Sequence, residues 1–136
     1  MRDRKLTALV ACVTILSLGH TADHIARGDL PLPLSAQSLP FILSNAVIYG
    51  ALGLSLFLYL RNKVGPGFVA IMAWLGLALG WLGHFSPFTD QTPQYICTAY
   101  RVPAVGYLAL GWLIALMAAL IVTALYAEYV WARASR

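Results

Sequence analysis

Residues 103–127 read PAVGYLALGWLIALMAALIVTALYA, a run that contains no Asp, Glu, Lys or Arg. A transmembrane helix needs about 20 consecutive and mostly apolar residues, and this run exceeds that length. A 3.6-residue period is hard to find in it because the run is apolar on every side, as lipid-facing helices are. The stretch therefore predicts a membrane-spanning helix over about 103–128.

Three more apolar runs precede this one, over about 6–24, 41–60 and 67–85. Of the 136 residues, 60% are hydrophobic and 10% are charged, whereas an average soluble domain carries about 25% charged residues. A soluble chain of this length could not bury so much apolar surface in one core. The predicted fold class is all-α: a polytopic membrane protein whose single domain, 1–136, is a four-transmembrane-helix bundle in the lipid bilayer.

The Lys and Arg residues in the connections predict the orientation of the bundle. Seven of them adjoin the ends of the runs that share a side with the termini, and two lie on the opposite side. Because cytoplasmic loops carry the excess of Lys and Arg, both termini are predicted to be cytoplasmic, in the inner (plasma) membrane. The net charge of +4 then reflects topology, and no nucleic-acid partner is expected. The seven are Arg2, Arg4, Lys5, Arg61, Lys63, Arg133 and Arg136, and the two are Arg27 and Arg101.

An alternative interpretation concerns the first run, which begins with charged residues and ends at Gly19-His20-Thr21-Ala22. This pattern could imitate a cleaved signal peptide. Cleavage after Ala22 would place His20 at the third residue before the cut, where small residues are preferred. We therefore favour a retained helix.

Histidines mark the ends of the runs that are predicted to face outward. His20 and His24 are four residues apart, so on a helix they lie on one face, one turn from each other. This spacing suits joint ligation of a divalent metal ion. Asp23 could be a further ligand, an acceptor for an imidazole N–H, or the ion-pair partner of Arg27.

The third histidine, His84, follows Gly76 and Gly80 at four-residue steps. Such a small-residue seam allows two helices to approach closely. We expect this seam to pack against a stripe of the first helix and so to bring His84 beside His20 and His24. The residues of that stripe are Ala8, Cys12, Leu16, His20 and His24.

Other polar residues fall at the same predicted depth. Asn45 lies near the start of the second run, Tyr107 lies near the start of the fourth, and Asp90 belongs to the connection that could fold over this end. The prediction is an outward-facing pocket with metal-ligand candidates His20, His24, His84 and Asp23, together with the polar residues Asn45, Asp90, Arg27 and Tyr107. The simpler alternatives are interfacial histidines and an Asn45 that merely joins two helices.

Three functions remain open for this pocket, and whether the protein is an enzyme is open too. A divalent metal such as Zn²⁺ could bind through three protein ligands and leave a position for water, which could make a small membrane hydrolase. Alternatively, axial histidines from two helices could hold b-type haem. The third interpretation is a non-catalytic accessory or scaffold subunit, and the long apolar flanks are compatible with a homo-oligomer or a larger membrane complex. The chain has no C-x-x-C motif, which excludes the dithiol chemistry of membrane thiol oxidoreductases.

Two short patches of this chain stand out: His-x-x-Asp-His-x-x-Arg-Gly over 20–28, and His84 followed by Ser86-Pro87-Phe88-Thr89-Asp90. In these patches the chain resembles a group of small, uncharacterised bacterial membrane proteins with four predicted spans. The resemblance implies a four-span fold and points to the same histidines, but it carries no activity.

Overall fold

The computed structural model describes residues 3–30 and 33–134, and the regular structure of this part is helical. The elements are α1 (Arg4–Arg27), the 3₁₀ helix η1 (Ala36–Ser38), α2 (Leu39–Leu60), α3 (Pro66–His84), α4 (Pro93–Thr98) and α5 (Pro103–Ala134). Four of them, α1, η1 with α2, α3 and α5, are long and apolar enough to cross a membrane. The predicted all-α fold with four membrane-spanning helices is thus confirmed. The short helix α4 was not predicted, and Arg2 and Arg136, which entered the orientation argument, lie outside the described residues.

Local chemistry fixes both ends of α1. Its first turn is capped by the Asp3 carboxylate, which accepts hydrogen bonds from the backbone amides of Lys5 and Leu6 at 2.8 and 2.9 Å. These bonds favour the charged carboxylate, and the Leu6 amide is the largest cause of the lowered pKa of Asp3. The helix ends at Gly28, whose φ of 87° is a left-handed conformation that glycine adopts without steric cost.

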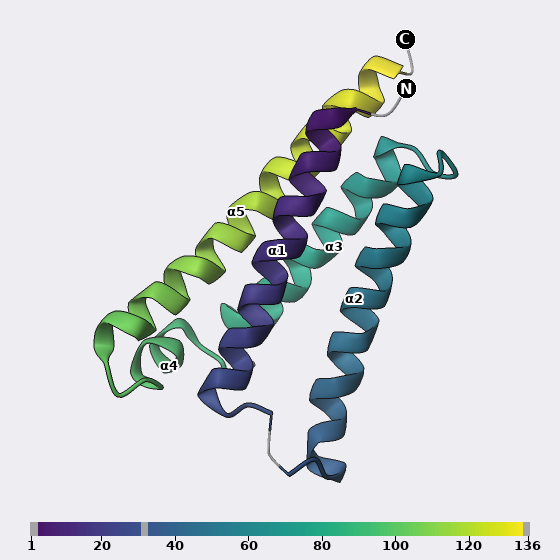
Figure 1. The fold of residues 1–136 in the computed structure, drawn as a ribbon. Helices are drawn as coiled ribbons and strands as arrows, with labels where there is room; N and C mark the ends of the chain where they lie inside the picture. The colour runs from purple at the N-terminus through teal and green to yellow at the C-terminus, as the bar shows by residue number, and fades with distance from the viewer. Residues whose placement is uncertain (1–2, 31–32, 135–136) are drawn as a thin grey trace.

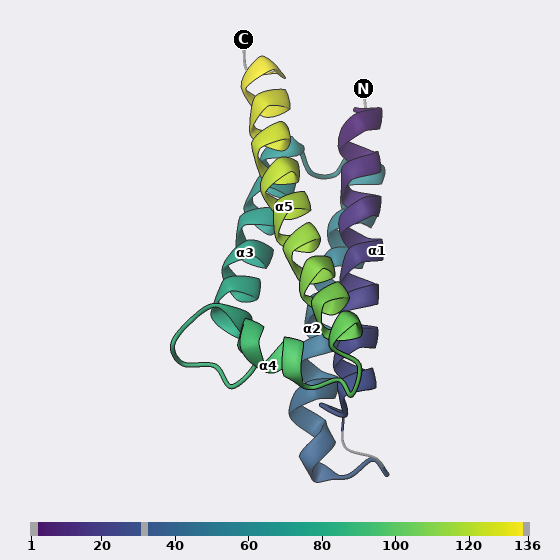
Figure 2. The same cartoon turned by 90° about the vertical axis from the view of Figure 1, so that its left-hand side faces the viewer.

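Helix α5 is the centre of the bundle, because it packs along both α1 and α3 (Figures 1 and 2). Its buried face includes Leu113, Leu116 and Leu120. One buried cluster joins Val13 of α1 to Ala73 of α3 through residues of α5. The long apolar run over residues 103–127 therefore supplies the surface on which two other spans assemble.

The predicted packing of the glycine seam on α1 is wrong. A Cβ at Gly76 would meet Leu120, and one at Gly80 would meet Met117, so the seam faces α5. On α1, Ala8 and Cys12 are exposed. Successive four-residue steps rotate about 40° around an α-helix, so a stripe drawn only with such steps leaves the buried face. The buried positions of α1 alternate four- and three-residue steps instead, at Leu6, Val10 and Val13.

Helix α2 packs less closely against the bundle than the other three spans do. Of its residues, all of which the structure describes, Ser55 and Tyr59 are the buried ones, and both lie near the α2–α3 turn. Away from that turn α2 diverges from α3 (Figure 1), while hydrogen bonds of Thr21 with Asn45 and Tyr49 keep it beside α1. A cavity of about 720 Å³ is lined by residues of α1, α2, α3 and α5. The bundle is thus closed at the end that holds the start of α1 and the end of α5, and it is open at the end that holds α4.

Candidate metal centre

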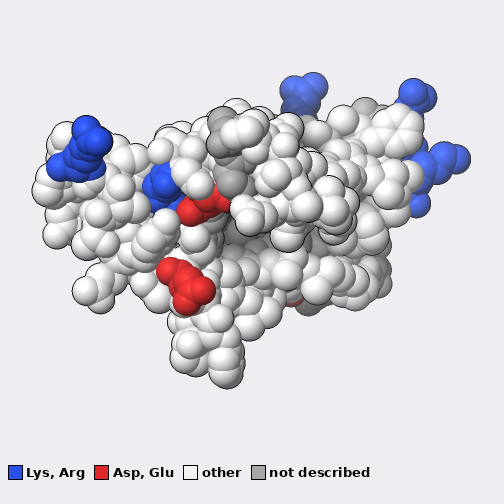
Figure 3. Space-filling model, turned by 90° about the horizontal axis from the view of Figure 1, so that it is seen from below, with Lys and Arg blue, Asp and Glu red and all other residues white. Residues whose placement is uncertain are grey.

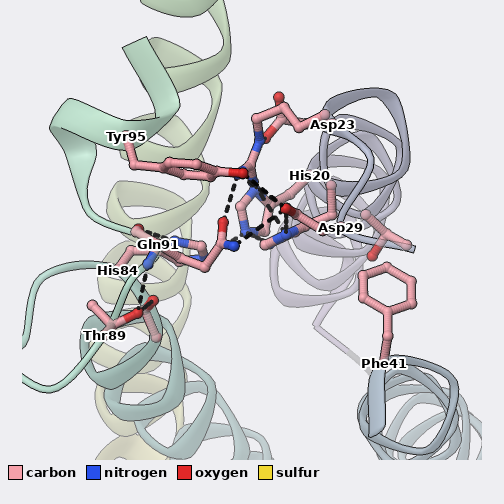
Figure 4. Close-up of polar contacts among 12 residues, drawn as sticks. His20, Asp23, Asp29, Phe41, His84, Thr89, Gln91 and Tyr95 are labelled. Carbon is pink, nitrogen blue, oxygen red and sulfur yellow. Dashed lines mark hydrogen bonds and ion pairs between the residues drawn. The ribbon is translucent and has the colours of Figure 1, made fainter. Parts of the chain in front are cut away.

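Three imidazole rings meet at the open end of the bundle. Nε2 of His20 lies 2.9 Å from Nε2 of His84 and 3.2 Å from Nε2 of His24. One ligand nitrogen from each ring lies within 4.8 Å of the other two. The predicted proximity of the three histidines is confirmed, and Figure 4 shows His20 and His84 among their polar contacts.

Two helices deliver these rings. His20 and His24 lie one turn apart near the end of α1, and His84 is the last residue of α3. His84 is buried, and the other two are half-buried. The meeting does not depend on a close α1–α3 seam, because the imidazoles reach across the space between the two helix ends.

Hydrogen bonds to Nδ1 of His24 and of His84 determine which way the lone pairs on their Nε2 atoms point. Nδ1 of His84 lies 3.0 Å from the carbonyl oxygen of Gln91, and Nδ1 of His24 lies 2.8 Å from the carboxylate of Asp29. The Gln91 carbonyl can only accept, so Nδ1 of His84 carries the proton of the neutral ring and its Nε2 presents a lone pair. Nδ1 of His24 also lies 3.1 Å from Nη2 of Arg27, which can only donate. The shorter contact, with the Asp29 carboxylate, favours a proton on this Nδ1 and a lone pair on Nε2. Both of these lone pairs point toward Nε2 of His20.

No placement of the ring protons gives every ring nitrogen of the three histidines a hydrogen-bond partner. If Nε2 of His20 carries a proton, it can donate to one neighbouring lone pair and leaves the other facing it. Within residues 3–30 and 33–134, Nδ1 of His20 is a buried side-chain nitrogen with no hydrogen-bond partner. A set of converging lone pairs held by hydrogen bonds to a carboxylate and a carbonyl is the arrangement found around metal ions in proteins.

A charged network surrounds the histidines. The guanidinium of Arg27, whose side chain is 0% exposed, pairs with Asp23 and Asp29, each at 3.0 Å. Gln91 accepts from Arg27 at 2.5 Å and donates to Asp29 at 3.2 Å. The two carboxylates outnumber the guanidinium, which leaves a net negative charge beside the rings and favours a cation. In Figure 3, acidic side chains lie next to the hollow of this face.

Asp23 faces away from the centre of the cluster. Its carboxylate accepts from the Tyr100 hydroxyl at 2.5 Å and from Nε of Arg27 at 3.0 Å. Burial raises the pKa of Tyr100 to about 12, and the hydrogen bond to Asp23 adds to this effect. Among the roles considered for Asp23, the structure contains the ion pair with Arg27, and among the described residues the convergent ligand set consists of the three histidines.

The remaining predicted residues divide into two groups. Asn45 joins the pocket: its side-chain oxygen accepts from the Thr21 hydroxyl at 2.9 Å, and Asn45 lines the cavity beside the histidines. Tyr107 is not brought to the pocket, because its side of α5 faces outward and it is 68% exposed. Asp90 lies exposed in the connection between α3 and α4.

The sequence did not lead us to predict that Asp29, Gln91 and Tyr95 belong to the site. Asp29 contacts His24 and Arg27 and accepts from the Tyr95 hydroxyl at 3.2 Å. One signal was available for Asp29, because it directly follows the glycine that ends α1 and so turns back toward His24. Gln91 and Tyr95 depend on the path of the connection from α3 to α4, and the local sequence does not fix that path.

Comparison of the chain with protein-family models, curated proteins and solved structures gives no match. The resemblance to four-span bacterial membrane proteins therefore stays a prediction, and the function is argued from the geometry of the three histidines.

Proposed function

We propose that this integral membrane protein binds one divalent transition-metal ion, Zn²⁺ in the first instance, through Nε2 of His20, His24 and His84. The observation that carries the proposal is the convergence of the three Nε2 atoms, at 2.9 and 3.2 Å for the two pairs that share His20. Tetrahedral zinc with bonds of about 2.0–2.1 Å separates its ligand nitrogens by about 3.3 Å. The remaining pair, His24 and His84, lies within 4.8 Å, so metal binding requires the rings to adjust until all three separations are about 3.3 Å.

The surroundings support a cation site. Asp29 and the Gln91 carbonyl hold Nδ1 of His24 and of His84 and leave Nε2 free for the metal. Three protein ligands leave a fourth position for water or another molecule. We further propose that this site faces outward across the plasma membrane, because the Lys and Arg residues favour a cytoplasmic location for the opposite end.

Haem is the second candidate, and the geometry favours it less. Axial ligands bind on opposite faces of the haem iron, so their nitrogens lie about 4 Å apart with bonds of about 2 Å like those of other metal–imidazole sites. The 2.9 Å separation of Nε2 in His20 and His84 is shorter, and His24 contacts the same nitrogen of His20. An absorbance spectrum separates the two candidates, since haem has a Soret band and Zn²⁺ has none.

The direct test is elemental analysis of detergent-purified protein carrying an affinity tag without histidines. We expect about one equivalent of zinc per chain in the wild type and a background amount in His84→Ala. The matched control is Asp90→Asn, which changes an exposed polar residue near the same end and should retain the metal. Substitution by Co²⁺ should give the visible absorption of a tetrahedral nitrogen site.

Two results would refute the proposal. One is wild-type protein that takes up neither zinc nor cobalt although its circular dichroism shows the expected helix content. The other is a metal content that stays unchanged in His84→Ala. An accessory or scaffold role predicts the first result. In that case alanine substitutions of the histidines would lower the stability of the bundle and have no other effect.

A further inference from the structure

The histidine cluster forms one end of the large cavity between α2 and the rest of the bundle. All three histidines line this cavity, and its volume of about 720 Å³ lies within the range of about 300–1,000 Å³ typical of small-molecule sites. From the histidines the cavity extends along α2 as far as Ser55, Leu56 and Tyr59. The candidate metal centre and the cavity are therefore one continuous site.

The polar part of the cavity wall is concentrated at the histidine end. There the Thr21 hydroxyl lies 2.9 Å from Oδ1 of Asn45 and 2.6 Å from the Tyr49 hydroxyl, which in turn lies 2.8 Å from the Ser17 carbonyl oxygen. Beyond this network the wall is mostly apolar, and its far end adjoins the buried cluster that contains Val10 and Tyr59. A site with one polar end and a long apolar remainder matches an amphiphile.

The length of the cavity fits one hydrocarbon chain. Asn45 and Tyr59, which line its two ends, are separated along α2 by about 21 Å at the helical rise of about 1.5 Å per residue. One leaflet occupies half of a hydrocarbon core about 30 Å thick, so a chain that fills one leaflet would fit with space to spare.

The cavity also has an entrance from the lipid side. Ile48 of α2 and Leu75 and Leu79 of α3 line the cavity, yet they are 39%, 53% and 57% exposed. Residues that both line a cavity and remain exposed mark its opening, and this opening lies between two membrane-spanning helices. A molecule already dissolved in the bilayer could enter without crossing water.

We infer that this cavity binds a single long-chain acyl compound, with its carbonyl or carboxylate oxygen at the three histidines and its chain along α2. The inference rests on the proposed metal, because an acyl oxygen would occupy the fourth ligand position that three imidazoles leave open. Zinc accepts carboxylate oxygen as a ligand, and the opposite charges of a carboxylate and the ion favour the pair. No reaction of the acyl compound is required for this binding.

The test uses photolabelling of the full-length protein in lipid nanodiscs loaded with zinc. The probes are palmitic acids that carry a diazirine either next to the carboxyl group or near the methyl end, and the labelled peptides are mapped by mass spectrometry. We expect the first probe to label the segment around Thr21 and Asn45 and the second to label the segment around Leu56 and Tyr59. The methyl esters of both probes show whether a carbonyl suffices or a carboxylate is needed.

A matched pair of variants tests the cavity itself. Ile48→Trp places an indole in the cavity opening and should reduce labelling at the Tyr59 segment at least several-fold while zinc stays bound. Val47→Trp makes a similar change at the neighbouring residue, which is 70% exposed and is not among the cavity-lining residues, and it should label like the wild type.

The outcomes separate the two proposals. Labels scattered over the lipid-facing side of α2, or labelling equal in both tryptophan variants, would overturn the acyl-chain site even if zinc binds. Wild-type protein that labels in the expected pattern but takes up no metal would refute the metal centre and its role in anchoring the acyl oxygen. In that case the chain site itself would be retained.

Discussion

At the scale of single residues, the candidate site could be predicted in part. The i, i+4 spacing of His20 and His24 fixes their common face because it depends on helix geometry alone. His84 could be added because its apolar run ends at the same depth. Of the contacts that orient these rings, the one with Asp29 had a signal in the sequence, the glycine that ends α1. The contact with Gln91 could not be predicted, since it depends on the path of the connection between α3 and α4.

Asp29 supplies the first prediction at this scale. Asp29→Asn replaces the carboxylate beside Nδ1 of His24 with a neutral amide, which weakens the hold on that ring and leaves Arg27 with one carboxylate partner. Replacement of such an outer partner typically weakens metal binding by about 10- to 100-fold. The expected loss is measured by competition against a zinc-binding dye.

Asp90→Asn is the control for this prediction, because it removes the same charge from an exposed position in the connection between α3 and α4. Equal zinc affinities for the two variants would show that Asp29 acts only through its charge or does not act on the site at all.

At the scale of helices, the sequence predicted where the spans lie but not how they are rotated. The four spans are apolar on most sides, and a helix without a polar face does not reveal which side is buried. This is why Tyr107 was expected in the pocket but lies on the outside of α5. It is also why the glycine seam was assigned to α1 although it faces α5.

The contact between α1 and α5 can be tested at Gly19. A Cβ at this position would overlap the indole ring of Trp112, and the indole N–H is fixed by a 2.8 Å hydrogen bond to the Leu16 carbonyl. We expect Gly19→Ala to lower the free energy of unfolding by about 1–3 kcal/mol, the usual cost of overpacking. Unfolding in mixed micelles by sodium dodecyl sulfate measures this change.

Gly50→Ala in α2 is the matched substitution, because a Cβ there has no neighbour within 4 Å. Alanine favours a helix over glycine by about 0.5–1 kcal/mol, so this variant should be as stable as the wild type or slightly more stable. A loss of stability in both variants would contradict the assigned contact at Trp112.

The Asp3 cap of α1 predicts that the stability of the folded protein depends on pH. Because hydrogen bonds lower the pKa of Asp3 below its ordinary value of 3.8, its charged form stabilises the folded state at higher pH. This contribution is complete above pH 3.8 and is lost as the pH falls through the lowered pKa of the folded state. Asp3→Asn keeps a capping side chain but cannot titrate.

The effect of Asp3 is the difference in thermal stability between the wild type and Asp3→Asn, measured by thermal unfolding from neutral pH down to pH 2. The wild type should lose stability relative to Asp3→Asn only at the acidic end of this range. A constant difference across the range would show that the charge of Asp3 does not stabilise the start of α1.

At the scale of the whole molecule, the proposed orientation can be tested with substituted cysteines. In a background with Cys12→Ala and Cys97→Ser, Gln94→Cys in α4 and Lys63→Cys in the α2–α3 turn place thiols at exposed positions on opposite ends. A membrane-impermeant maleimide added to intact cells should label Gln94→Cys and leave Lys63→Cys unlabelled until the cells are broken. The reverse pattern would place the histidines in the cytoplasm.

The divergence of α2 from α3 has a consequence for how the occupancy of the cavity would be controlled. An entrance that opens between α2 and α3 exchanges its contents with the surrounding lipid, so the relevant concentration is a mole fraction in two dimensions. Adding buffer to a vesicle suspension would leave a bound amphiphile in place, whereas fusing in empty lipid would draw it out. In a cell, such a protein would respond to the composition of its own membrane.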